Sequence, residues 1–237
     1  NGSPAQGLAY NCPLAPPRPL CGTYNAVLGN PAVPASLING QYISTDPDAT
    51  WIGQETRSDL DSWGLHGTIE GEVGALTLRS FSAYRDLEAQ FARDSDNTPV
   101  PFSATANDYR YTQISQEFQV LGQAVDDRLD YVLGLYFLDE DGSDRSSTNL
   151  TLVAAQNLAE IDNQSYAAFG QGTFRLTDRL SATAGLRYTR EEKELFLDVR
   201  RPNGAIVVPA QTVAEDFTNT SPRLGLEFQA TPDLLAY

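Results

Sequence analysis

Residues 180–189 read Leu-Ser-Ala-Thr-Ala-Gly-Leu-Arg-Tyr-Thr, so that apolar and polar side chains alternate at nearly every position. One parity holds Leu180, Ala182, Ala184, Leu186 and Tyr188, and the other holds Ser181, Thr183, Arg187 and Thr189. A period of two is typical of a β-strand with one apolar face and one polar face. The stretch therefore predicts a strand that separates an apolar environment from a polar one.

The same alternation recurs along most of the chain. It is found over 61–73, 76–84, 114–120, 129–137, 166–176 and 221–229, and another apolar position begins at Leu234. From Trp63 onward, His66 and the charged residues of these stretches lie on the polar parity, among them Glu70, Glu72, Arg79, Glu117, Arg175, Arg187, Arg223 and Glu227, and so does the adjoining Arg85. A charge facing the middle of a bilayer costs about 2–4 kcal/mol for Arg or Lys, so a lipid face must lack charges. The core face of a soluble sandwich also lacks them, and this feature alone does not separate the two folds.

The connections between the expected strands separate them better. Short links occur near Gly74, near Asp126, at 177–179 and at 231–233, whereas long links span 86–112, 139–163 and 190–217. Outer-membrane barrels have this asymmetry, with short periplasmic turns and long extracellular loops. We therefore predict an all-β, antiparallel up-and-down transmembrane barrel over 59–237, represented by about eight strands of a larger barrel. The Pro-, Gly- and Asn-rich residues 1–58 predict a long extracellular loop.

Aromatic residues recur at fixed places in these strands. Tyr84, Phe137 and Tyr188 each follow a Leu by eight residues on the same face, which corresponds to about 26 Å along a strand. At a tilt of about 40–45° this becomes a height of about 19–20 Å, close to the apolar band of an outer-membrane barrel. Phe174 and Phe228 lie just before two of the short turns. We therefore expect Tyr84, Phe137 and Tyr188 in an outer aromatic girdle, and Phe174 and Phe228 in a periplasmic one, although aromatic residues are common in any strand.

Composition excludes several classes of protein. The chain of 237 residues has a formal net charge of −15, which argues against binding to nucleic acid phosphates. No apolar run approaches the roughly 20 residues of a spanning helix. No signal peptide is visible at Asn1, and the chain contains no Met; we therefore interpret it as a fragment or a processed form.

Cys12 and Cys21 flank a Pro-rich stretch within the predicted loop. Two cysteines this close, far from any histidine, favour a disulfide over two unrelated thiols. A disulfide would imply an oxidising compartment.

Several motifs resemble the barrel of TonB-dependent receptors. They are Ser80-Phe-Ser-Ala-Tyr-Arg85, Ser115-Gln-Glu-Phe-Gln119, Gly134-Leu-Tyr-Phe137, 163–189 and Ser221-Pro-Arg-Leu-Gly225. The resemblance extends from about Asp59 to Tyr237, and the order of the motifs is more specific than any one of them. It implies an active importer of the bacterial outer membrane, energised through TonB, whose barrel has about 22 strands around an internal plug. The expected partners are outer-membrane lipid, the TonB complex through regions outside this chain, and a small-molecule ligand.

The resemblance implies uptake of a scarce ligand, and a ferric siderophore is the ligand expected from the family alone. The alternatives are a passive porin-type barrel and a secreted all-β binding module; an enzyme is not expected, and neither is a cofactor. The chain shows no plug domain and no segment that would contact TonB, so we expect that it neither transports nor closes into a pore alone.

Few residues of the sequence are candidates for a metal, catalytic or ligand-binding site. His66 is the only histidine, which excludes a histidine cluster for metal binding or catalysis within the chain. The acidic run 139–144 is expected to be a solvated loop rather than a calcium site. Arg187 and Arg223 are expected to face the lumen, where they line it or contact a plug, and a salt bridge with Glu227 or Glu117 is favoured over ligand binding. Tyr109 and Tyr111 fit either a ligand contact or the outer girdle.

Overall fold

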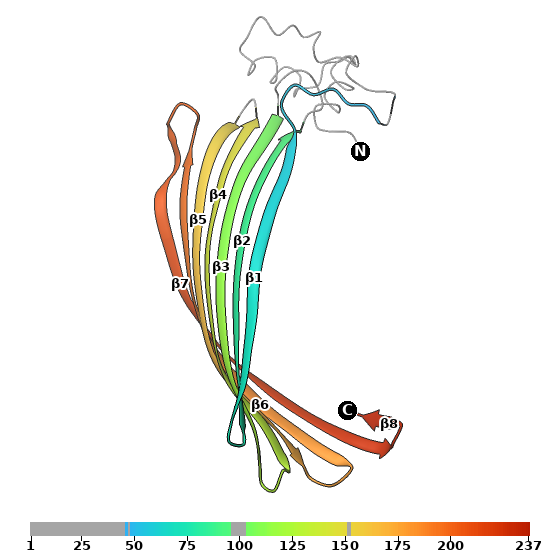
Figure 1. The fold of residues 1–237 in the computed structure, drawn as a ribbon. Helices are drawn as coiled ribbons and strands as arrows, with labels where there is room; N and C mark the ends of the chain where they lie inside the picture. The colour runs from blue at the N-terminus through green and yellow to red at the C-terminus, as the bar shows by residue number, and fades with distance from the viewer. Residues whose placement is uncertain (1–45, 47, 96–102, 151–152) are drawn as a thin grey trace, which may run out of the picture.

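The computed structural model describes residues 46, 48–95, 103–150 and 153–237, which form one antiparallel sheet of eight strands in chain order (Figure 1). The strands are β1 (Arg57–Val73), β2 (Leu76–Asp94), β3 (Ser103–Ala124), β4 (Leu129–Leu150), β5 (Val153–Arg175), β6 (Leu180–Arg200), β7 (Ile206–Thr231) and β8 (Leu234–Ala236). Each strand pairs with the next in the chain. The predicted up-and-down order, with seven full strands and the start of an eighth, is confirmed.

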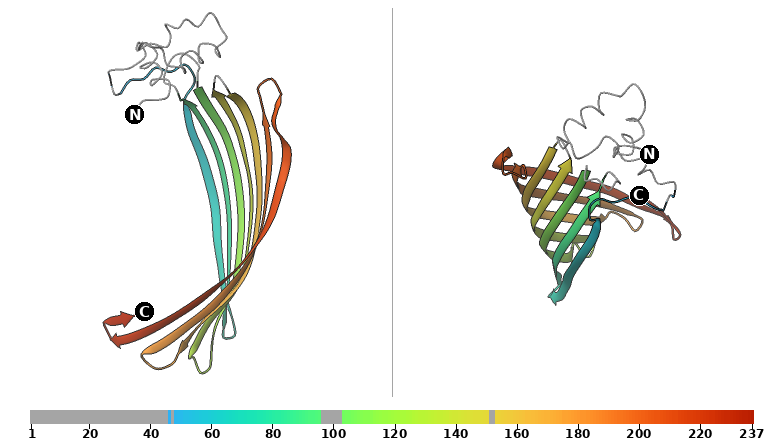
Figure 2. Two further views of the ribbon diagram at one scale, coloured as in Figure 1. Left: turned by 180° about the vertical axis from the view of Figure 1, so that it is seen from behind. Right: turned by 90° about the horizontal axis from the view of Figure 1, so that it is seen from above.

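The sheet is a single twisted and curved layer that does not close (Figure 2). Both edges, β1 and β8, pair on one side only. Within the described residues only three apolar side chains are buried, Ala89, Ala104 and Ala167, so no core lies between packed layers. A sandwich would bury one face of this sheet against a second sheet. The fold is therefore that of an incomplete barrel wall.

The register keeps the predicted faces together across the strands. Leu65 of β1 pairs with Tyr84 of β2, which pairs with Ile114 of β3, and all three belong to the predicted apolar parity. Large apolar side chains on this face are widely exposed in the isolated wall, with Leu65 at 71 % and Leu224 at 84 %. This face needs an apolar environment outside the chain.

The short turns match the predicted positions. Gly74 has a φ of 63°, and the turn between β3 and β4 places Val125, Asp126 and Asp127 at φ values of 57°, 51° and 61°. The hydroxyl of Thr177 accepts hydrogen bonds from the backbone N–H groups of Arg179 and Leu180 at 3.3 and 3.1 Å, which closes the turn between β5 and β6. Short hydroxyl residues favour turns for this reason.

The other end of the sheet differs from the prediction. Most of the expected long links 86–112, 139–163 and 190–217 are β-strand, so that β3, β4 and β7 run for 22, 22 and 26 residues. The predicted loop 1–58 lies largely outside the described residues; the described part before Arg57 contains no strand. Among the described residues there is also no helix with the length and apolarity needed to cross a membrane. The strands are long because the alternation of apolar and polar residues continues beyond the predicted bounds, with the apolar residues now on the opposite face.

Candidate functional site

The outward face, defined here as the predicted apolar parity, changes character along every long strand. On β4 it is apolar from Leu129 to Phe137, and the next outward residues are Asp139 and Asp141. On β1 it is apolar from Val73 back to Trp63, and the residues before that are charged. The ten intervals from Trp63 to Val73 span about 33 Å along the strand, or about 25 Å of height at a tilt of about 40°. This height equals the usual apolar band of an outer-membrane barrel.

Aromatic side chains lie where the outward face changes from apolar to charged residues. We call this level of the sheet the aromatic boundary; residues between it and the short turns lie below it, and residues toward the other strand ends lie above it. The rings of Trp63 and Tyr84 lie 5.0 Å apart, and those of Phe137 and Tyr166 lie 5.2 Å apart. Tyr188 lies on the same face of β6. Trp63 and Tyr166 were absent from the predicted girdle, because their pairing depends on the register between strands. The assignment of Tyr84, Phe137 and Tyr188 to a membrane interface stays a prediction.

The proposed periplasmic girdle residues lie at the turn end of the same face. Phe174 pairs with Leu129 and Ala182, and Phe228 pairs with Leu180. Their interface role also stays a prediction. Cys12 and Cys21 lie outside the described residues, so their predicted disulfide is not described.

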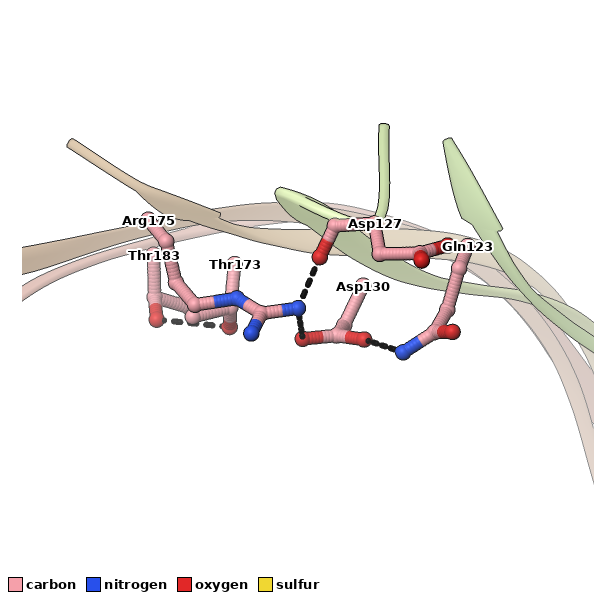
Figure 3. A network of polar contacts seen from close by, with 6 residues as sticks. All are labelled: Gln123, Asp127, Asp130, Thr173, Arg175 and Thr183. Carbon is pink, nitrogen blue, oxygen red and sulfur yellow. Dashed lines mark hydrogen bonds and ion pairs between the residues drawn. The ribbon is translucent and has the colours of Figure 1, made fainter. Parts of the chain in front are cut away.

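The inward face below this boundary is mainly polar and internally hydrogen-bonded, with the apolar side chains Phe81, Leu121, Val132, Leu138 and Phe169 among its polar ones. Near the short turns, Arg175 contacts the carbonyl of Asp127 and lies 3.8 Å from the Asp130 carboxylate, which accepts a hydrogen bond from Gln123 at 2.7 Å (Figure 3). Thr173 and Thr183 hydrogen-bond across β5 and β6 at 2.9 Å. These groups link β3, β4, β5 and β6 along one polar face, as expected for a lumen lining.

The two predicted lumen arginines lie on this face but do not form the expected ion pairs. The Arg187 guanidinium lies 5.3 Å from the Tyr136 ring centre and 5.7 Å from that of Phe169. Arg223 donates a hydrogen bond to the side chain of Gln171 at 3.1 Å. Neither pairs with Glu117 or Glu227 among the ion pairs of the described residues. The sequence prediction was wrong here because opposite charges on one face were not neighbours in the register.

Above the boundary the outward face becomes charged, while the inward face gains an apolar row beside its polar residues. The outward face carries mainly acidic residues: Asp59, Asp61, Asp86, Glu88, Asp94, Asp108, Asp139, Asp141, Glu160, Asp162, Glu192, Glu194, Asp198 and Asp216, with Arg57, Arg110, Arg145, Arg190 and Arg200. The inward face instead carries an apolar row of register partners, Leu87, Tyr111, Gly142, Ile161, Leu195 and Val213. We call this set the apolar row. It would line the mouth of a closed barrel.

The apolar row forms a continuous surface. A Cβ at Gly142 would lie 2.8 Å from Ile161 and 3.4 Å from Tyr111, so both side chains lean over this glycine. Ile161 is 37 % and Val213 53 % exposed. Next to the row, Phe91 and Tyr109 form an edge-to-face pair with ring centres 6.0 Å apart. Exposed apolar surface in a concave wall is typical of a ligand site.

Directly below the apolar row lies a polar row of register partners: Arg85, Gln113, Glu140, Asn163, Lys193 and Glu215. The Tyr111 hydroxyl donates a hydrogen bond to Glu140. Burial, and then this contact, raises the pKa of Tyr111 to about 12. Lys193 lies 3.2 Å from Glu191 and 5.7 Å from the centre of the Phe217 ring.

Tyr109 and Tyr111 therefore lie on the inward face and not on the outward face that carries Tyr84 and Phe137, and their contact with a ligand stays a prediction. The acidic run 139–144 is not a loop: Asp139 and Asp141 face outward while Glu140 and Asp144 face inward. Carboxylates on opposite faces of a strand cannot converge on one calcium ion. Asp94, at the far end of β2, accepts hydrogen bonds from the backbone N–H groups of Gly53 and Gln54 at 2.7 and 3.2 Å.

Comparisons with known proteins agree with this geometry. Residues 19–237 match the family model described as "TonB dependent receptor-like, beta-barrel". The crystal structure of the ferric yersiniabactin uptake receptor FyuA from Yersinia pestis is similar, with a TM-score of 0.60 and 16 % sequence identity. The match covers 73 % of this chain and 26 % of that receptor, so the chain spans about a quarter of the receptor's length.

Proposed function

Because the chain belongs to the TonB-dependent receptor β-barrel family, whose barrels are bacterial outer-membrane proteins, we propose that it is the part of an active importer that lines one side of the ligand mouth. The proposed cargo is a ferric siderophore, taken up with energy delivered through TonB by regions outside this chain. The protein then acts as a transporter and not as an enzyme.

The observation that carries the proposal is the row of apolar side chains that runs across the inward face above the aromatic boundary. A passive wall needs a polar inner surface along its whole height, since water fills the lumen. Here a row of apolar side chains, which includes Leu87, Tyr111 and Ile161, crosses the inner surface where the strands leave the apolar band. Such a surface is favourable when a ligand covers it. This supports ligand capture over passive diffusion.

The same boundary supports a membrane position. We propose that Tyr84, Phe137 and Tyr188, joined by Trp63 and Tyr166, lie at the outer interface of the bilayer. Phe174 and Phe228 lie at the periplasmic one. Amphipathic rings are enriched at these two levels of outer-membrane barrels.

The experiment uses cells that carry or lack the full receptor, in TonB-positive and TonB-negative backgrounds. Accumulation of labelled iron is measured with ferric siderophores, beside labelled cobalamin and a labelled oligosaccharide. We expect uptake of a ferric siderophore that requires both the receptor and TonB. Receptor-dependent uptake of cobalamin or oligosaccharide alone, or uptake without TonB, would overturn the proposal.

A further inference from the structure

The charges of the inward mouth surface compensate one another. Above the aromatic boundary its basic residues are Arg85, Arg93 and Lys193, and its acidic residues are Glu140, Asp144, Glu191 and Glu215. The polar row alternates in sign, with Arg85 followed by Glu140, and Lys193 followed by Glu215. No excess of positive charge is left within the described part of this surface.

A strongly anionic ligand would require a different surface. Recognition of several negative charges in proteins uses clustered Arg and Lys side chains that lack acidic neighbours. Here Lys193 lies 3.2 Å from Glu191. In addition, the outward face of the same strands is acidic, and fixed charges of one sign repel an approaching ligand of that sign.

The apolar row offers contacts of another kind. Tyr111 and Ile161 close over Gly142, and Leu195 continues the surface to β6 at 41 % exposure. The edge-to-face pair of Phe91 and Tyr109 extends it toward the strand ends. These groups gain most from covering apolar or aromatic atoms, because burial of such surface is favourable and non-directional.

We propose that the cargo of this mouth is a ferric complex of low net charge with an apolar or aryl periphery, which covers the apolar row above a polar row whose two basic and two acidic residues balance. This inference rests on the proposed function, since it assumes an iron complex. It specifies the charge class of the cargo, and Tyr111, Ile161 and Leu195 as the residues that determine specificity.

The test measures binding to the full receptor in outer-membrane vesicles. The probes are a neutral ferric tris-hydroxamate with aryl substituents, the same complex with hydroxyl substituents, and a ferric tris-catecholate of net charge about −3. We expect the neutral aryl complex to bind about tenfold or more tightly than either of the other two. Tighter binding of the tris-catecholate would overturn the inference and leave the proposed function intact. Binding of none of the three, together with binding of cobalamin, would overturn the proposed function itself.

Variants connect the result to the apolar row. Ile161→Glu should weaken binding of the aryl complex about tenfold or more, because it places a carboxylate against the apolar surface. Glu194→Lys is the matched control: it changes charge on β6, but on the outward face, and should leave binding unchanged. Heat-dependent mobility in detergent gels verifies that both variants fold. A folded Ile161→Glu receptor with unchanged affinity would overturn the assignment of the row.

Discussion

Leu133 lies at the centre of the outward apolar band of β4, four residues from Leu129 at the turn and four from Phe137 at the aromatic boundary. Its side chain is 54 % exposed in the isolated wall and would meet a Cβ at Gly170 at 2.9 Å. In a bilayer this exposed part contacts hydrocarbon. Leu133→Arg should therefore lower the free energy of unfolding by about 2–4 kcal/mol. At 1.4 kcal/mol per factor of ten, the folding equilibrium constant falls about 30- to 700-fold.

The neighbouring residue provides the matched control. Val132 lies on the inward face, where it pairs with Gln171 of β5. Val132→Arg introduces the same side chain one position away, but toward the lumen and away from lipid, and should cost about 1 kcal/mol or less. Phe137→Arg is a depth control: the charge costs about 0–1 kcal/mol at the interface, and loss of the ring pair with Tyr166 adds about 0.5–1.5 kcal/mol.

The assay is equilibrium unfolding of the full receptor in phospholipid vesicles with guanidinium chloride, followed by tryptophan fluorescence. The order of destabilisation should be Leu133→Arg first, then Phe137→Arg, then Val132→Arg. Equal destabilisation by Leu133→Arg and Val132→Arg would refute the assignment of the two faces, since both changes differ only in the side of the wall that they reach.

Three further predictions concern local geometry. Gly134→Ala should destabilise the protein by about 1–3 kcal/mol in the same unfolding assay, because a Cβ there would overlap the Phe169 ring. Gly67→Ala is the control: a Cβ added there would have no neighbouring atom within 4 Å, and the change should cost less than about 1 kcal/mol. Val125→Asn should raise stability by about 1 kcal/mol, since Asn tolerates a φ of 57° better than a β-branched residue, and an unchanged midpoint would contradict a left-handed Val125. Tyr111 should ionise near pH 12 and not near 10. Its raised pKa stabilises the fold below pH 10, and this contribution is lost as the pH rises to about 12. In an absorbance titration at 295 nm, Tyr111→Phe should therefore remove one step near pH 12.

The sequence predicts the features that are set within a single strand: its extent, its two faces and the turn beside it. The alternation from Leu180 to Tyr188 gives the strand and its faces, and Thr177 marks the turn before it. What lies across strands depends on register, which the turns set: the turn at Val125 pairs Ala124 with Leu129 and aligns every later pair of β3 and β4. The pairing of Phe137 with Tyr166 therefore was not predictable from spacing within a strand.

The mouth was missed for a different reason. Beyond Tyr84 the apolar residues of β2 shift from even to odd positions, at Leu87, Ala89 and Phe91. A search for one uninterrupted apolar parity ends at Tyr84 and assigns the rest to a loop. The alternation itself is continuous, and only the environment of each face changes at the membrane boundary.

The surroundings of Arg187 show how a small residue decides a contact. Gly134 has no side chain, so the Phe169 ring can lie over its Cα. Phe169 is the register partner of Arg187, and the ring of Tyr136 lies nearby, which places the guanidinium against two aromatic faces. The pattern of charges along the chain does not indicate this arrangement.

The unbroken strands also limit how this mouth can change during evolution. The register is regular from the short turns up to Leu197, and its shifts between β6 and β7 occur only near the tip, around Val199. Insertion or deletion of a single residue below the tips would turn the acidic outward face into the lumen and the apolar row toward solvent. We therefore expect length changes among related receptors to occur at the tips, or within strands in steps of two residues.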